Sequence, residues 1–452
     1  CSGEGVRVAV VDDGLEIAHE DLAANIATGQ SYNYLDASSD PTPPNDVNSH
    51  GTKVGGIIAA RDMNDLGVRG VAPRANLVGY NVVQSPTESN LAGAMTRGSP
   101  DVHVSSNSWG PIDGTGNPIA SSFAWRTAIT SGLTNGRDGK GTIYVWAGGN
   151  GANGVGPNID NSNNDGQANN RGVIAVGAVT DQGIKAFYSE PGANVLVSAP
   201  AGELCYGHTI STTDLSGEGG DNTSITAGDT DYTDTNYTKC MNGTSAATPT
   251  ISGVVALILQ ANPSLGWRDV RSILARTAKK NDAVNADWAV NDAGLDINHN
   301  YGFGVVDAGA AVSLATTWVN LTSEIMSASP LYSVNMAIPD DNATGIVDAV
   351  TISGSGISEI ESIEITFSSD HAYTGDLEIT LTHVITGITE TVSLLSEENL
   401  CVRPCTEYNA WVFSSVRHLG EAADGDWTLT VKDLAPLDIG TFQSWSMRFY
   451  GT

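Results

Sequence analysis

Four residues of the chain have side chains that together could hydrolyse an amide bond, and they follow one another in the order Asp12, His50, Asn150 and Ser245. A serine nucleophile needs a base to take its hydroxyl proton, and the base needs a carboxylate that fixes its tautomer and orientation. We assign these roles to Ser245, His50 and Asp12. The Asn150 amide would donate a hydrogen bond to the oxyanion that forms on the substrate carbonyl.

Each of these residues lies in a short motif at the predicted end of a strand or start of a helix. The motifs are Val10–Gly14, Ser49–Thr52, Ala147–Gly151 and Asn242–Pro249. A helix that starts near Ser245 supplies free backbone N–H groups and the positive end of a dipole, and Gly243 lets a substrate approach closely. One such motif alone is typical of ordinary helix capping. All of them in one chain, with separations of 38, 100 and 95 residues, predict a catalytic site.

Residues 1–318 alternate between strand-like and helix-like segments, which predicts an α/β fold. Continuous apolar runs at 6–11, 102–106, 142–146 and 173–179 are typical of parallel strands that are buried on both faces. Helices are expected at 121–131 and at 246–260, and the second is apolar enough to be fully buried. Ligands bind at the carboxyl ends of such strands, which is where the four motifs are predicted to lie.

The pattern changes after residue 316. Segments 363–367, 376–382 and 427–432 alternate apolar with polar residues, which predicts half-buried antiparallel strands and a β-sandwich from 326 to 452. We expect a linker at 317–330. The Gly-, Ser-, Thr- and Asp-rich segment 211–236 is expected to be a surface loop.

Charge, hydropathy and cysteine content indicate the classes of binding partner and the cellular compartment. The chain has 452 residues and a formal net charge of −30, which argues against nucleic acid and favours metal ions or basic peptides, although such charge can also serve solubility alone. No apolar run is long enough to predict a membrane span, and any secretory leader is expected to have been removed. The cysteine spacing suggests disulfides Cys205–Cys240 and Cys401–Cys405, with reduced buried thiols as the alternative. Cys1 would be free, or would have lost its partner.

The order and motifs of the catalytic residues resemble the subtilase superfamily over residues 1–318. The segments 108–111, 145–151 and 299–304 narrow this resemblance to the kexin and furin branch, and 338–340, 371–377, 425–429 and 445–452 resemble the P domain of that branch. The resemblance implies a subtilisin-like parallel sheet flanked by helices, followed by an all-β jelly-roll P domain at 326–452. It also implies a secreted, extracellular, bacterial protein whose partners are protein substrates with basic cleavage sites and a propeptide or maturation chaperone.

The same resemblance implies how a substrate would bind. Kexin-like enzymes cleave after paired basic residues, which acidic pockets accept. The implied residues are Asp13 for the penultimate basic side chain, Asp113 and Asp165 for the primary pocket, and Ser108, Trp109 and Gly110 along the groove. Ile112 and Gly93 replace acidic residues of furin, so we expect a dibasic requirement without a longer basic motif. The alternatives are a broad-specificity subtilase and a non-catalytic binding module.

Two calcium sites are also implied by the resemblance. Calcium prefers six to eight oxygen ligands, many of them backbone carbonyls. The first site would use the Asp21 carboxylate, the Asn64 side chain and the carbonyls of Asp62, Leu66 and Val68, although one ligand of the family lies upstream of this chain. The second would use Asp113, Asp160 and Glu190 beneath the primary pocket. The alternative is that these three are solvated loop acids that never converge.

Overall fold

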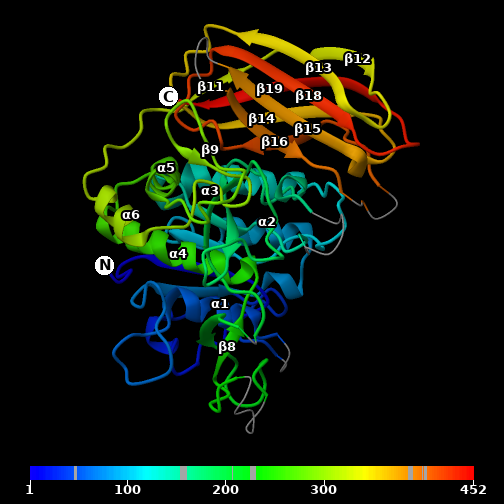
Figure 1. Ribbon diagram of the computed structural model, residues 1–452. Helices are drawn as coiled ribbons and strands as arrows, with labels where there is room; N and C mark the ends of the chain where they lie inside the picture. Colours follow the sequence, from blue (N-terminus) through cyan, green and yellow to red (C-terminus); the bar gives the residue numbers. More distant parts are fainter. Residues whose placement is uncertain are drawn as a thin grey trace.

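The computed structural model describes residues 1–44, 48–152, 160–205, 207–223, 231–384, 390–399, 401 and 405–452. The first two thirds of the chain form a sheet with helices on both sides, and the last third forms stacked antiparallel strands beside it (Figure 1). The division into an α/β part and an all-β part therefore agrees with the change in sequence pattern near residue 320.

The central sheet is parallel and has six strands in the order β2-β1-β3-β4-β5-β6. Its strands are β1 Arg7–Val11, β2 Asn76–Tyr80, β3 Val104–Asn107, β4 Ile143–Ala147, β5 Val173–Val179 and β6 Val195–Pro200. All seven residues of β5 are buried, as the continuous apolar run predicted. The chain adds β2 on one side of β1 and then β3 to β6 on the other side, so the direction of winding changes at β1. The carboxyl ends of β1, β3 and β4 therefore lie side by side at this point, where open parallel sheets bind ligands.

The helices cover both faces of this sheet. They are α1 His50–Ala59, α2 Glu88–Thr96, α3 Phe123–Gly139, α4 Thr244–Ala261, α5 Trp267–Thr277 and α6 Ala308–Ala315, with 3₁₀ turns at Ala23–Asn25, Val82–Gln84, Ser162–Asn164 and Thr374–Asp376. Val8 and Val10 of β1 pack in one core with α1, α4, α5 and α6. Ala9 and Val11 point to the other face, where they pack in a second core with α2 and α3.

Helix α4 carries the candidate nucleophile and is also the most apolar helix. By length and composition it is the one described helix that could cross a membrane, but 72% of the window that qualifies is buried inside the protein. Its neighbours are α1, α6 and strands of the central sheet. Its apolar character is therefore explained by its place in the core.

The segment 211–236 differs from the expected surface loop. Its first residues belong to β7 Ile210–Thr213, which pairs with β8 Tyr237–Met241. The hydroxyls of Thr212 and Thr213 are buried and donate to the carbonyls of Lys53 and Thr52 in α1. The prediction was wrong here because these hydroxyls find backbone acceptors on α1. Residues 224–230 lie outside the described part.

The all-β part is a sandwich of two antiparallel sheets. One contains β11 Ile325–Ala328, β12 Tyr332–Ala337, β14 Ile360–Ser369, β17 Trp411–Ser415 and β19 Thr441–Gly451; the other contains β13 Asn342–Ile352, β15 Leu377–Val384, β16 Glu390–Ser396 and β18 Gly425–Asp433. A short hairpin, β9 Ala289–Val290 with β10 Asp296–Ile297, precedes it. The prediction of a linker at 317–330 is partly wrong, because residues 325–328 form an edge strand that pairs with β19.

Polar and apolar contacts join the sandwich to the α/β part. The Asn163 side chain donates to the Ser414 carbonyl at 2.9 Å and accepts from the Ser414 N–H at 2.8 Å. Val416 and Leu419, which follow β17, pack into the same core as α4. Both predicted disulfides, Cys205–Cys240 and Cys401–Cys405, are present, and Cys1 is free and exposed.

Candidate active site

Asp12 and His50 meet where β1 ends and α1 begins. The Nδ1 atom of His50 lies 2.8 Å from Oδ1 of Asp12, whose side chain is buried. Burial lowers the pKa of the His50 imidazole, but the Asp12 carboxylate opposes this through its charge and hydrogen bond, and the net pKa is raised. The carboxylate thus stabilises the imidazolium and directs the Nε2 atom of His50 away from itself. This is the arrangement of a general base with its orienting acid.

Ser245 is the second residue of α4, and it lies beside the end of β3. Its hydroxyl donates to the Ser108 carbonyl at 3.1 Å, and the Ser108 hydroxyl donates to the Ser245 carbonyl at 3.0 Å. Gly243 precedes the helix with φ of +82°, a conformation that L side chains rarely adopt, and its position explains the glycine in the motif. The Ser245 hydrogen must leave Ser108 before it can pass to a base.

The orientation of Asn150 depends on the residue that precedes Ser245. Oδ1 of Asn150 accepts from the Thr244 N–H at 2.8 Å and from the Thr244 hydroxyl at 2.9 Å. Because both bonds hold the carbonyl oxygen, the amide nitrogen of Asn150 is turned to the opposite side. Asn150 and Ser245 both line one cavity, so this amide can serve as a donor there.

The cavity beside Ser245 has a volume of about 260 Å³ and collects most of the predicted substrate residues. Its lining includes Ser108, Trp109, Gly110, Ile112, Asp113, Asn150, Asp160, Asp165, Glu190 and Ser245. None of the described residues that line it is lysine or arginine. A side chain or ion that entered it would meet four carboxylates and no fixed positive charge.

Three of these carboxylates, those of Asp160, Asp165 and Glu190, have raised pKa values. Burial, followed by the nearby charges of Asp160 and Asp113, raises the pKa of Glu190 well above its usual range. Burial also raises the pKa of Asp165 to about 7, and Asp113 adds to this shift. The pKa of Asp160 is raised by burial, although three backbone N–H groups donate to it. Such a group of acids favours a bound cation.

Two family models match this chain. Residues 3–304, more than half of the chain, match the family described as "Subtilase family". The chain belongs to the subtilase family. Residues 360–449 match "Proprotein convertase P-domain". The predicted fold class is confirmed: the subtilase has a parallel sheet flanked by helices, followed by a P domain of antiparallel strands.

Named relatives of the subtilase belong to the kexin and convertase branch. It is 34% identical over its whole length to mouse "Proprotein convertase subtilisin/kexin type 7", of which it spans 57%. It is 32% identical over 99% of its length to the "Dibasic-processing endoprotease" of Schizosaccharomyces pombe, of which it spans 61%. The crystal structure of a serine protease of Aeromonas sobria superimposes with a TM-score of 0.89 and 29% identity, covering 100% of this chain and 89% of that one.

In the subtilase, Asp13 lies outside the cavity and caps helix α1. Its two carboxylate oxygens accept from the backbone N–H groups of Gly51 at 2.7 Å and His50 at 3.2 Å. Burial and the charge of Asp12 raise its pKa to about 6. The capping contact was not foreseen, because the sequence does not reveal which acid reaches the start of α1. A role of Asp13 in substrate binding stays a prediction.

The two groups of predicted calcium ligands are brought together to different degrees. Asp21 accepts from the Asn64 side chain at 2.6 Å and the Val68 N–H at 3.0 Å, and Asp62, Asn64, Leu66 and Val68 line one shallow hollow. In the second group, Asp113 accepts from the Asn150 N–H and Glu190 from the Gly151 N–H. Asp113, Asp160 and Glu190 share the cavity, but they are not among the described clusters whose ligand atoms all lie within 4.8 Å of one another.

Two residues with evident roles in this site were missed from the sequence. Thr244 orients Asn150, and Tyr188 accepts a hydrogen bond from the Gly243 N–H at 2.9 Å. The position of Thr244 directly before a serine at a helix start was a usable signal. Tyr188 had none, because it reaches Gly243 across 55 residues of chain.

Proposed function

We propose that this subtilase is a secreted, calcium-dependent serine endopeptidase that cleaves after basic, preferentially paired basic, residues. The observation that carries the proposal is the cavity beside Ser245, which holds Asp113, Asp160, Asp165 and Glu190 without a lysine or arginine among its described lining residues. We assign residues 1–318 to the catalytic domain and 326–452 to the P domain. The relatives named for dibasic processing and proprotein conversion support the same substrate class.

In the proposed mechanism His50 takes the proton of Ser245 while the serine oxygen attacks the substrate carbonyl. Asp12 stabilises the imidazolium that results. The oxyanion accepts hydrogen bonds from the Asn150 amide and from the backbone N–H of Ser245 at the start of α4. His50 then returns the proton to the leaving amine, and water releases the acyl group from Ser245 by the same steps in reverse.

The preference for basic substrate side chains would come from the carboxylates of Asp13, Asp113 and Asp165. Asp165 lines the cavity against Gly110, where an added Cβ would lie 3.0 Å from Oδ2 of Asp165, so the glycine keeps that carboxylate accessible. A guanidinium or ammonium group next to Asp113 and Asp165 would gain charge-assisted hydrogen bonds. Asp13 would meet the penultimate basic side chain. Ser108, Trp109 and Gly110 would hold the substrate backbone.

The donor set fits calcium at two places. Asp113, Asp160 and Glu190 supply carboxylate oxygens, and Asp21, Asn64 and the carbonyls of Asp62, Leu66 and Val68 supply a mixed oxygen set. Bound calcium would supply the positive charge that keeps the cavity acids ionised. The raised pKa values of Asp160 and Glu190 support a cation near them.

Location and maturation are inferred from the disulfides and from one structural relative. Two disulfides support an oxidising, extracellular compartment. A serine protease of Aeromonas sobria is described in complex with a chaperone, and it superimposes on this chain with a TM-score of 0.88. We therefore propose a propeptide or chaperone as a maturation partner.

A peptide panel tests the proposal. Peptides would carry Lys-Arg, Ala-Arg, Lys-Leu or Ala-Phe before the cut, and kcat/KM would be measured with calcium present. We expect Arg→Leu next to the cut to lower kcat/KM by more than about 100-fold, because leaving a buried charge unpaired costs about 3–5 kcal/mol. Comparable cleavage of all four would favour a broad-specificity subtilase. Failure of Ser245 to react with a fluorophosphonate would favour a non-catalytic scaffold.

A further inference from the structure

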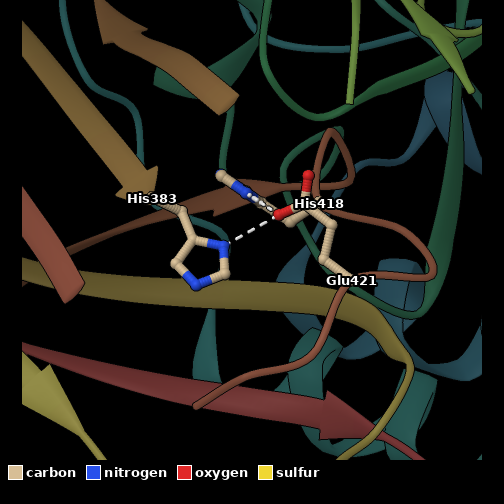
Figure 2. Close-up of side chains that lie close together, drawn as sticks. All are labelled: His383, His418 and Glu421. Carbon is tan, nitrogen blue, oxygen red and sulfur yellow. Dashed lines mark hydrogen bonds and ion pairs between the residues drawn. The ribbon is translucent and has the colours of Figure 1, made fainter. Parts of the chain in front are cut away.

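Two histidines and a glutamate form a buried cluster in the β-sandwich, far from the residues of the catalytic mechanism in sequence. The Nδ1 atoms of His383 and His418 each lie 2.9 Å from the same oxygen, Oε2 of Glu421. Both histidines are completely buried and Glu421 is 2% exposed. Figure 2 shows both rings directed at this one oxygen. Three ligand atoms thus converge, all within 4.8 Å of one another.

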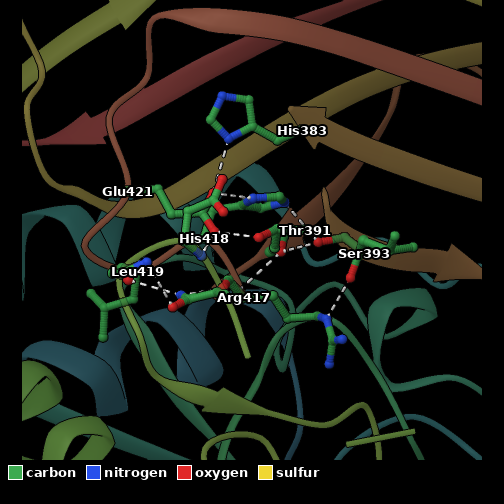
Figure 3. A network of polar contacts seen from close by, with 12 residues as sticks. His383, Thr391, Ser393, Arg417, His418, Leu419 and Glu421 are labelled. Atoms are coloured by element: carbon green, nitrogen blue, oxygen red, sulfur yellow. Dashed lines mark hydrogen bonds and ion pairs between the residues drawn. The ribbon is translucent and has the colours of Figure 1, made fainter. Parts of the chain in front are cut away.

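The cluster is held in place by a second layer of contacts. Oε1 of Glu421 accepts from the Thr391 hydroxyl at 2.5 Å, and Nε2 of His418 lies 3.0 Å from the Ser393 hydroxyl (Figure 3). The His383 ring stacks on Trp427 with 3.8 Å between centroids. Both rings and the carboxylate are therefore oriented by groups outside the cluster, as metal ligands usually are.

Some buried polar atoms in and beside the cluster have no hydrogen-bond partner. Asp292 lies beside it, since the Asp292 N–H donates to Oε1 of Glu421 at 3.0 Å. Both carboxylate oxygens of Asp292 are buried without a hydrogen-bond partner, and so is Nε2 of His383. Arg417, which precedes His418, is buried, and its Nε donates to the Val392 carbonyl at 2.7 Å.

We propose that His383, His418 and Glu421 bind one divalent transition-metal ion, with Zn²⁺ as the first candidate. Two imidazole nitrogens and one carboxylate oxygen form a donor set that zinc favours, whereas calcium takes six to eight oxygens. Zinc bonds of about 2.0–2.1 Å at tetrahedral angles separate ligand atoms by about 3.3 Å. The present 2.9 Å distances would therefore widen by about 0.4 Å. A water molecule would complete the four-coordinate site.

The position of the cluster gives the ion a structural role. His383 lies on β15, while His418 and Glu421 follow β17 in the turn whose residues Val416 and Leu419 pack into the core of the catalytic part. Asp292 belongs to the β9–β10 hairpin before the sandwich. A bound ion would thus join the two sheets of the sandwich. It would also be connected to the preceding hairpin, because the Asp292 N–H donates to Glu421. We expect it to stabilise the junction without touching the substrate.

Metal content and stability test this proposal independently of protease activity. The full chain would be produced with Zn²⁺ in the medium, purified with calcium present, and analysed for zinc by mass spectrometry. We expect about one equivalent in the wild type and less than about a tenth in His383→Gln and His418→Gln. His299→Gln is the matched control, because His299 is buried and also lies 2.8 Å from a carboxylate, that of Asp287, but outside the cluster.

Cobalt provides a second readout. Protein produced with Co²⁺ in place of Zn²⁺ should show the visible absorption of tetrahedral cobalt in the wild type and in His299→Gln, but not in His418→Gln. Metal-loaded wild type should melt about 5 °C above metal-free wild type, and His418→Gln should show no such difference. A wild type without zinc or the cobalt spectrum would overturn the proposal and leave a hydrogen-bonded network. Equal zinc in wild type and both cluster variants would place the metal elsewhere.

Discussion

Removing the Thr244 hydroxyl tests whether the orientation of Asn150 controls turnover. Thr244 is completely buried, and its hydroxyl and N–H both donate to Oδ1 of Asn150, at 2.9 and 2.8 Å. Thr244→Val keeps the volume of the side chain and the N–H bond but removes the hydroxyl bond. The Asn150 amide would then be less firmly directed toward the oxyanion.

The magnitude follows from one lost bond out of two. A neutral hydrogen bond contributes about 1 kcal/mol, so kcat should fall by about 5-fold in Thr244→Val with KM little changed. Removing the donor itself in Asn150→Ala should lower kcat by about 10²–10³, the usual loss for one oxyanion donor. The two effects should not add. In Asn150→Ala protein, the further change Thr244→Val should have almost no effect on kcat.

The assay is steady-state hydrolysis of a Lys-Arg peptide by the wild type, both single variants and the double variant. Thr250→Val is the matched control, since Thr250 lies on the same helix and its hydroxyl donates only to the Ala246 carbonyl at 3.1 Å. Equal melting temperatures would show that helix α4 is intact. A 5-fold loss that persists in the double variant would refute the reasoning, because Thr244 would then act on the helix and not through Asn150.

Three further predictions concern the nucleophile and the cavity acids. Ser245→Ala should abolish hydrolysis and fluorophosphonate labelling without lowering the melting temperature, because the buried body of α4 holds the helix; residual hydrolysis would contradict the assignment. Burial raises the pKa of Asp165 to about 7, so it destabilises calcium-free protein progressively from about pH 4 to 7. At pH 8 the calcium-free Asp165→Asn protein should therefore be more stable than wild type, by on the order of 4 kcal/mol of unfolding free energy, and at pH 4 the two should melt at the same temperature. An equal melting temperature at pH 8 would argue against a buried anion. Glu190→Gln should shift the calcium midpoints of activity and melting temperature upward together, and an unchanged midpoint for activity would exclude Glu190 from the calcium site.

Some elements could be predicted because short stretches of sequence determine them. Strand β5 has the bounds that its apolar run predicted, and α4 was foreseen because its residues from 246 onward are mostly apolar. The order of the catalytic motifs was sufficient to identify the fold class, since each motif lies at the end of a strand or the start of a helix. Such signals are local, and they survive without knowledge of any distant contact.

Other features depended on neighbours that the sequence does not name. The expected helix at 121–131 begins at Phe123 and runs beyond residue 131, until the backbone leaves the helical conformation at Gly136, Arg137 and Asp138. The buried Arg137 side chain donates there to the Gly141 carbonyl, a contact that the sequence does not name. Residues 325–328 became a strand because the edge of β19 was there to pair with them.

The clearest division concerns the charged side chains. The types and spacing of Asp12, His50 and Ser245 are enough to indicate their chemistry, because each is marked by its neighbours in sequence. Asp13 turned to the start of α1, and His383 met Glu421 across 38 residues of chain. Which acid caps a helix, and which imidazole reaches a carboxylate, depends on strand pairing and on burial, where an unpaired charge costs several kcal/mol. Only the tertiary structure determines those partners.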